Sequence, residues 1–376
     1  MAEYLTNTTD LTAVANAIRE KGGTSEQLAC PDGFVAALQA IQTGAPLQIA
    51  VATNAGATVT ATKGSKTVSG TADTSGNCTL TVDEAGTWTV TATTASTTKT
   101  SDVVVGISNV DLPLVDSVLN NNSWETIKKV SDAGQGENYW SVGDRKEVTL
   151  NGTVGHLSLS NYTTYAFIIG FNHNASVEGA NRIHFQLAKT ALSGGIDVAL
   201  CDSSYNSIVS TTGYFSMNAN NTNSGGWKSS QMRTKICGTS LSSYSGTIIA
   251  VIPAALRAVL KPVTKYTDNI AGGSAEISNI TATTDYFFLL SEFEVFGSIS
   301  YGNTNEKNKQ AQYSYYSAGN SKAKYNHSAT STAAVIWWLR SPRASRSTNF
   351  VIVSTRGTVS GASVDYSRGF APGFCV

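Results

Sequence analysis

Two stretches near the end of the chain decide the fold: Trp337-Trp338-Leu339-Arg340-Ser341-Pro342 and Gly369-Phe370-Ala371-Pro372-Gly373-Phe374-Cys375-Val376. Each contains an apolar block long enough for a buried strand. The residues between them, 343–366, are small, polar and rich in turn formers, with a few large side chains among them. A polar, loop-like segment held between scaffold strands is typical of a binding surface. We therefore expect a rigid platform that presents residues 343–366.

The composition of this segment is typical of a paratope. It combines planar arginine donors, aromatic anchors and small adaptable hydroxyls. The candidate ligand-binding residues are Arg343, Ser345, Arg346, Ser347, Asn349, Phe350, Ser354, Arg356, Ser360, Asp365 and Tyr366. The expected framework beneath them is Trp337, Trp338, Arg340 and Phe374.

Arginine is concentrated in the same region. Five of the ten arginines follow residue 339, where Asp365 is the only acid, although the whole chain balances 26 basic against 26 acidic residues. This local excess favours a ligand with negative charge, such as an anionic glycan, a teichoic-type polymer or an acidic protein face. The alternative is that these arginines only solubilise a loop surface.

The motif WWLRSP, the variable middle and the ending GFAPGFC resemble the C-terminal lectin-like domain of phage and bacterial surface proteins. The resemblance extends upstream to residues 170–174 (Gly-Phe-Asn-His-Asn) and 182–186 (Arg-Ile-His-Phe-Gln), and so covers roughly residues 110–376. It implies a C-type-lectin-like fold of the formylglycine-generating-enzyme variant, which binds partners without calcium. Some members are variable proteins of diversity-generating retroelements. In these proteins, mutation of template adenines converts Asn-type codons into codons for Ser, Tyr, Asp, Arg, Gly or Phe. Every candidate ligand-binding residue except Arg343 has an identity that this process would leave.

Overall composition excludes several classes of function. The neutral charge balance argues against a nucleic-acid binder. No apolar run approaches the ~20 residues that a membrane-spanning helix needs. The N-terminus lacks the basic and apolar regions of a signal peptide. These features predict a virion protein that is made in the bacterial cytoplasm and is extracellular after release, with neither nucleic acid nor membrane as a partner.

Reactive chemistry is not expected. The five cysteines include no C-x-x-C pair, so buried free thiols are favoured over a Cys201–Cys237 or Cys237–Cys375 disulfide. His173 and His184 have only one acid between them, Glu178, and are expected to be structural. No G-x-S-x-G motif occurs, and the acids are too scattered to nominate a catalytic pair. We expect no enzyme activity, no catalytic residue, no cofactor and no bound metal, although a structural calcium ion stays open.

The N-terminal region, residues 1–43, is predicted to form two short helices. Asp10 caps the first, and Pro31 lies in the first turn of the second. The stretch resembles N-terminal modules of phage tail proteins, which implies attachment to other tail or baseplate proteins. The alternative is a helical cap on the next domain.

Period-two alternation begins after the linker at residues 43–46. Residues 44–106 are predicted to be an immunoglobulin-like β-sandwich that acts as a spacer, with Trp88 in its core. Residues 107–376 are predicted to be the C-type-lectin-like ligand-binding domain. Within it, residues 303–326 are expected to be a long exposed excursion. Its tyrosines are expected either to extend the binding surface or to pack the loop down. The predicted fold class is thus multidomain, β-rich α+β.

These features together predict a phage tail-tip protein that recognises a host cell-surface protein or glycan. Repeated copies, with a trimer favoured, would strengthen weak single-site binding. The alternatives are a structural tail or virion decoration protein, and a bacterial surface adhesin.

Overall fold

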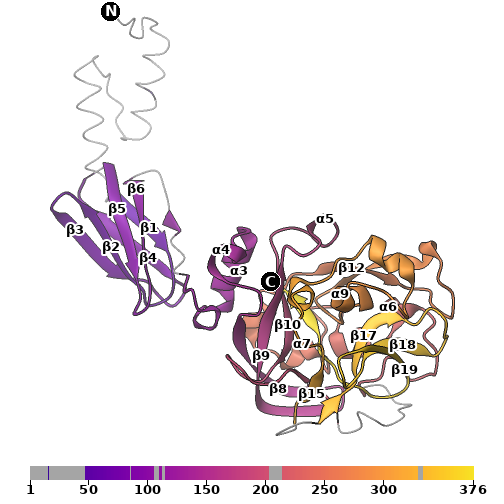
Figure 1. Cartoon of the computed structure of the whole chain (residues 1–376). Coiled ribbons are helices and arrows are strands. Elements are labelled where there is room, and N and C mark those ends of the chain that lie inside the picture. Colours follow the sequence, from indigo (N-terminus) through magenta and orange to yellow (C-terminus); the bar gives the residue numbers. More distant parts are fainter. Residues whose placement is uncertain are drawn as a thin grey trace, which may run out of the picture. The chain divides into compact units, whose positions relative to one another are not determined.

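The computed structural model describes residues 16, 47–84, 86–105, 110–111, 115–202, 214–328 and 333–376. The helical pair predicted over residues 1–43 lies outside this set, apart from Asn16. The chain divides into two compact units, Met1–Val115 and Asp116–Val376. Both are built from β-sheets, so the prediction of a β-rich multidomain chain is confirmed (Figure 1).

The first unit contains two sheets that share one core. One sheet has the strand order β3(Lys66–Thr71)-β2(Thr58–Lys63)-β5(Gly86–Thr93)-β6(Thr98–Val105). The other has the order β4(Asn77–Val82)-β1(Leu47–Ala52)-β7(Val110–Asp111). β7 pairs with β1, so this unit extends past residue 106, where the sequence placed the boundary.

Alternate residues of these strands point into the space between the two sheets. Trp88 is fully buried there, and its indole N–H donates to the carbonyl of Glu84 at 3.1 Å. That bond pairs the indole N–H, which is the only polar group of this buried, otherwise apolar side chain. The period-two pattern therefore forms the strands expected of it.

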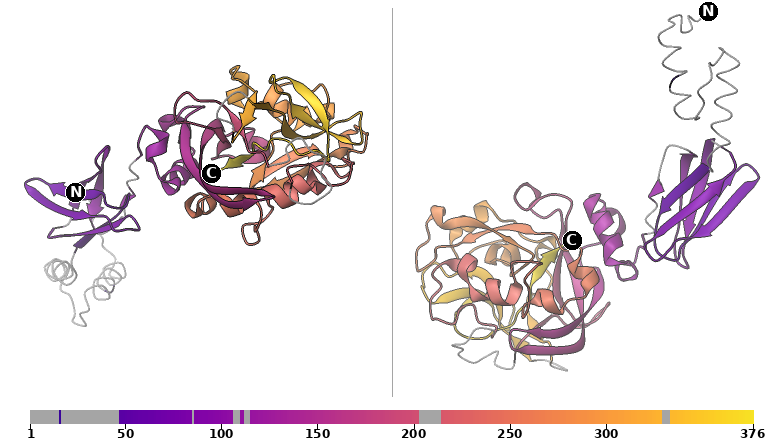
Figure 2. Two further views of the ribbon diagram at one scale, coloured as in Figure 1. Left: turned by 90° about the horizontal axis from the view of Figure 1, so that it is seen from below. Right: turned by 180° about the vertical axis from the view of Figure 1, so that it is seen from behind.

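The second unit is organised around a five-stranded sheet. Its order is β14(Phe287–Phe288)-β20(Gly373–Cys375)-β10(Ile183–Lys189)-β9(Leu157–Phe171)-β8(Arg145–Val154). Figure 2 shows this unit from two further directions. The helix α3(Trp124–Asp132) begins after Ser123, whose side chain accepts from the N–H of Thr126 as an N-cap. Trp124 packs edge-on against the rings of Phe185 and Phe374, which attaches the helix to the sheet.

Three smaller sheets complete the second unit. Their orders are β17(Trp337–Pro342)-β18(Asn349–Val353)-β19(Val359–Ser363), β11(Val198–Ala199)-β15(Lys324–Asn326)-β16(Ala334–Val335), and β12(Val263–Asp268)-β13(Ile280–Asp285). β17, β18 and β19 lie side by side in Figure 1.

The other helices of the second unit are short. They are η1(Leu119–Asn121), α4(Gly136–Tyr139), α5(Ala175–Glu178), α6(Gly226–Ser229), η2(Met232–Cys237), α7(Ile248–Val251), α8(Ala254–Arg257), η3(Ile277–Asn279), α9(Glu292–Phe296), η4(Thr304–Asn308) and α10(Ser314–Ser317). α7 and α8 are separate helices, because Pro253 restricts the preceding Ile252 to an extended conformation. Among the described residues, no helix is long and apolar enough to cross a membrane.

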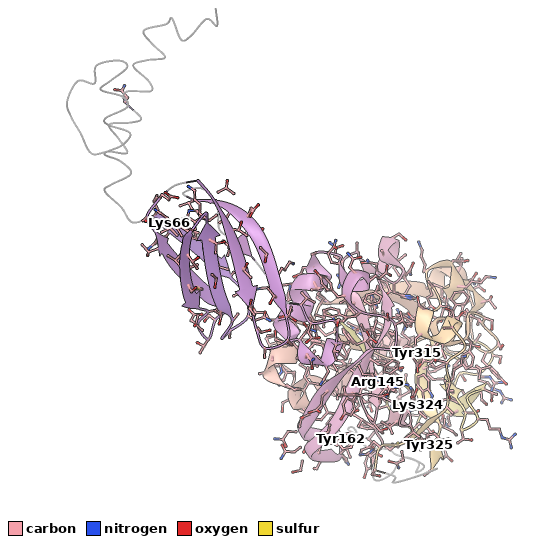
Figure 3. The ribbon with its side chains drawn as sticks, turned by 60° about the vertical axis from the view of Figure 1, so that its left-hand side comes forward. Lys66, Arg145, Tyr162, Tyr315, Lys324 and Tyr325 are labelled. Carbon is pink, nitrogen blue, oxygen red and sulfur yellow. The ribbon has the colours of Figure 1, made fainter. Side chains whose placement is uncertain are left out.

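Residues 303–326 are not the exposed excursion that their polar composition predicted. Tyr313, Tyr315 and Tyr316 are buried, and the segment includes η4, α10 and β15. Lys189 donates to the hydroxyl of Tyr315 at 2.7 Å, and Figure 3 labels Tyr315 within the second unit. The alternative in which the tyrosines pack the segment down is therefore the one observed.

Candidate binding surface

The framework of the expected surface is buried. β17 has no exposed residue, and Trp337, Trp338, Arg340 and Phe374 are each fully buried. The indole of Trp337 donates to the carbonyl of Lys322 at 2.9 Å, and that of Trp338 donates to the carbonyl of Phe215 at 2.8 Å. Both tryptophans thus fill the core while their only polar atoms remain paired.

Arg340 is the ionic centre of this framework. Its guanidinium binds both carboxylate oxygens of Glu294, with Nη2 at 2.7 Å from Oε1, and also donates to Thr267 Oγ1 and to the carbonyl of Leu289. Ser291 and Glu294 form a capping box that orients Glu294 at the start of α9. Burial by itself would raise the pKa of Glu294, but the adjacent charges of Arg340 and Lys265 hold that pKa below its ordinary value.

The network continues to Lys265. Its ammonium lies 2.6 Å from Glu178 Oε2 and 3.0 Å from Glu294 Oε1, and it donates to the Tyr313 hydroxyl at 2.8 Å. All of these side chains are buried. Burial raises the pKa of Glu178 to about 7, against the opposing effect of the Lys265 charge.

The two histidines flank this network. His173 stacks on the Tyr313 ring at 3.7 Å, and His184 Nδ1 lies 3.1 Å from the Tyr313 hydroxyl. Burial, followed by the charge of Lys265, lowers the pKa of His173 to about 3, so its imidazole is neutral at physiological pH.

His173, Glu178 and Glu294 bring potential metal-ligand atoms within 4.8 Å of one another. The carboxylates of this set are already neutralised, because the ammonium of Lys265 lies between them and Glu294 also binds Arg340 on both oxygens. A divalent cation would have to displace Lys265. The arrangement suits an ion-pair network that stiffens the framework.

Four loops meet at one end of the β17–β18–β19 sheet, and we call them the loop cluster: residues 220–226, 268–279, 299–306 and 343–349. Asn223, which is 0% exposed, ties three of them together. Its Nδ2 donates to the carbonyls of Arg346 and Asn349 at 2.8 Å each, and its backbone N–H donates to the carbonyl of Ser347 at 2.7 Å. Its Oδ1 accepts from the N–H of Gly272 at 2.9 Å.

The fourth loop is held by separate contacts. The N–H of Ala344 donates to the carbonyl of Tyr301 at 2.9 Å, and the guanidinium of Arg343 lies over the Tyr301 ring at 4.6 Å. Asn303 donates to Asp268 Oδ2 at 2.8 Å. Sequence reasoning did not identify Asn223 or Tyr301 as parts of the surface.

The candidate ligand-binding residues differ in exposure. Ser345, Arg346, Ser347 and Arg356 are exposed, whereas Arg343, Asn349, Ser354, Ser360, Asp365 and Tyr366 are half-buried. Phe350 is 0% exposed, which corrects its expected role as a surface anchor. It lies in β18, where Phe350, Val351, Ile352 and Val353 are all buried, so its ring belongs to the core.

The candidate residues also do not form one continuous site. Asp365 and Tyr366 follow β19 at the loop-cluster end, where the N–H of Val364 donates to the carbonyl of Thr348 at 3.0 Å. Ser354 and Arg356 belong to the turn between β18 and β19, at the other end of β18. Five residues of strand separate the two ends by roughly 13 Å. Ser360 lies between them, opposite Ile352.

The turn at residues 354–358 has different neighbours from the loop cluster. A Cβ placed on Gly357 would lie 3.1 Å from the backbone N of Ala323, which puts this turn against residues 322–323. Arg356 is therefore separate from Arg343 and Arg346.

A family model described as a domain of unknown function (DUF6273) matches residues 205–376. The matched region contains all four loops of the cluster and the β17–β18–β19 sheet. No curated protein matches the chain.

Proposed function

We propose that this chain is a receptor-binding protein of a phage tail tip, which recognises a host cell-surface ligand through the loop cluster. The observation that carries the proposal is the separation of main chain from side chain in residues 345–347. Asn223 fixes the carbonyls of Arg346 and Ser347, while the side chains of Ser345, Arg346 and Ser347 are exposed. Side chains on such a backbone can be exchanged without moving it. That property supports a surface diversified by a retroelement.

In this proposal the second unit is a C-type-lectin-like domain, and the two-sheet sandwich is an immunoglobulin-like spacer. Residues 1–43 attach the chain to other tail or baseplate proteins. Trimerisation raises the apparent affinity by increasing the effective concentration of each site. The protein is a component of the virion and carries out no catalysis.

The ligand is expected to be anionic. Arg343 and Arg346 lie at the loop-cluster end of the sheet, where Asp268 and Glu306 are buried and Glu276 is the one exposed acid of the four described loops. The stacking of Arg343 on Tyr301 holds its guanidinium in one orientation, which favours paired hydrogen bonds to a carboxylate or phosphate.

The test is binding of the full chain to a panel of intact bacterial cells of diverse surface type. A loop-cluster variant carries Arg343→Ala, Arg346→Ala and Tyr366→Ala. Its matched control carries Thr355→Ala, Arg356→Ala and Thr358→Ala at the other end of β18. The first variant should lose at least about tenfold in affinity, equivalent to about 1.4 kcal/mol, whereas the control should bind as the wild type does.

Both variants should remain folded, and circular dichroism melts measure the modest loss of stability expected from truncating the half-buried Arg343 and Tyr366. Binding should also weaken as the salt concentration rises from about 0.05 M to about 0.5 M. Unchanged binding by the loop-cluster variant would contradict the proposal and favour a structural role in the tail.

A further inference from the structure

Two isoleucines in one loop of the loop cluster are exposed. Among the described residues, the large hydrophobic side chains with the greatest exposure are Ile277 at 66% and Ile270 at 57%. Both belong to loop 268–279. Val118 at 54% and Leu192 at 45% lie elsewhere in the second unit, where they line a hollow of about 330 Å³. The most exposed apolar pair is therefore concentrated in one loop of the cluster.

This loop is held in one conformation by hydrogen bonds. Asp268 Oδ1 accepts from the N–H of Ile270 at 3.1 Å and from the N–H of Ala271 at 2.7 Å. Asn303 donates to the carbonyl of Glu276 at 3.0 Å, next to Ile277 in η3. Because the backbone is already fixed, little conformational entropy remains to be lost when the isoleucines are covered.

The same loop is joined to the arginine-bearing loop. The N–H of Gly225 donates to the carbonyl of Ile270 at 2.9 Å, and the N–H of Gly272 donates to Asn223, which also binds Arg346. The loop that carries the exposed isoleucines is thus bonded, through Asn223, to the loop that carries the arginines.

We infer that the ligand of this surface is a folded protein, with an apolar patch that covers Ile270 and Ile277 and carboxylates that pair with Arg343 and Arg346. The inference rests on the proposed function. An apolar centre beside arginines is the usual composition of a protein–protein interface. A polysaccharide offers mainly hydroxyl groups, to which exposed aliphatic side chains such as Ile270 and Ile277 contribute little binding.

The experiment compares an Ile270→Ser/Ile277→Ser variant with a Val118→Ser/Leu192→Ser control in the full chain. The control removes two aliphatic side chains of similar exposure outside the loop cluster. Both are tested on cells that bind the wild type, before and after protease treatment of the cells, and after periodate oxidation of their glycans. Circular dichroism melts establish that both variants remain folded.

The isoleucine variant should bind at least tenfold more weakly, while the control stays within twofold of the wild type. Protease treatment should abolish binding, and periodate should leave it intact. Wild-type affinity in the isoleucine variant, or binding that is lost to periodate and resists protease, overturns the inference.

The loop-cluster arginine variant separates the two possible failures. If that variant loses binding while the isoleucine variant keeps it, the proposed function stands and the protein ligand is wrong. If both variants bind as the wild type does, or the wild type binds no cells, the proposed function fails as well.

Discussion

Asn223 donates a 2.8 Å hydrogen bond from its side chain to the backbone carbonyl of Arg346, although 123 positions separate the two residues in the chain. The bond fixes the main chain at a position whose own side chain is exposed. The backbone shape of loop 343–349 therefore depends on a buried residue outside that loop. The exposed side chains of residues 345–347 do not supply these bonds.

Replacing Asn223 by aspartate should destabilise the second unit by about 3 kcal/mol, because a buried carboxylate then faces the carbonyls of Arg346 and Asn349 without a proton to donate. Urea denaturation measures this change. Asn221→Asp is the control: Asn221 is exposed, and its Oδ1 accepts from Ser363, as an aspartate would. Equal stability of the two variants would show that Asn223 does not hold the loop.

Arg340→Lys should cost at least about 3 kcal/mol of unfolding free energy, even though it conserves charge. Lysine cannot reproduce the two-pronged contact with Glu294 or reach Thr267 and the carbonyl of Leu289 at the same time. The same substitution at the exposed Arg346 should change stability by less than about 0.5 kcal/mol. Differential scanning calorimetry of the two variants tests this contrast, and similar losses would be inconsistent with the central position of Arg340.

His327 should make the second unit sensitive to acid. Its Nδ1 accepts from the N–H of Cys201 at 3.1 Å, and burial lowers its pKa to about 4. The unfolded chain takes up this proton near pH 6.5, so the stabilising effect of the neutral ring is present above that pH. It is lost as the pH falls toward 4.

The His327→Asn variant keeps an acceptor for Cys201 without the titration. The difference in unfolding free energy between wild type and variant should shrink by about 1–2 kcal/mol from pH 7 to pH 4, after screening by solvent is allowed for. Denaturation curves across this range provide the measurement. A difference that does not change with pH would exclude His327 as an acid-sensitive group.

The four described cysteines, Cys78, Cys201, Cys237 and Cys375, are free and buried. Burial raises the pKa of Cys201 and of Cys375 to about 12. All four thiols should therefore resist alkylation in the native protein and react after unfolding in guanidinium, as counted by intact mass. Thiols that stay unreactive after unfolding until a reductant is added would indicate a disulfide.

The framework was predictable from local pattern. The apolar block around Trp337 and the Ser123 cap of α3 are signals contained within a few residues, and both features are present. The burial of Phe350 was also predictable from the sequence, because Phe350 begins an uninterrupted apolar run. Such runs are found in strands that are covered on both faces. Its polar neighbours obscured that signal.

Other features have no local signature. Glu178 and Lys265 are 87 positions apart, and only the tertiary fold makes them an ion pair. Asn223 resembles the other asparagines of a turn-rich segment until its distant partners are known. The tyrosines of residues 303–326 lie among polar residues, so composition alone could not distinguish a buried segment from an exposed one.

β20 lies between β14 and β10 in the main sheet, and it is formed by residues 373–375, about 190 positions after its partner strand. During translation, one edge of β10 therefore stays unpaired until residues 373–375 have been synthesised and have left the ribosome. An open, apolar strand edge can pair with the same edge of another nascent chain. The yield of native protein should thus depend on the rate of synthesis: slower translation lengthens the time for which this edge is open and should favour aggregation over correct closure of the sheet.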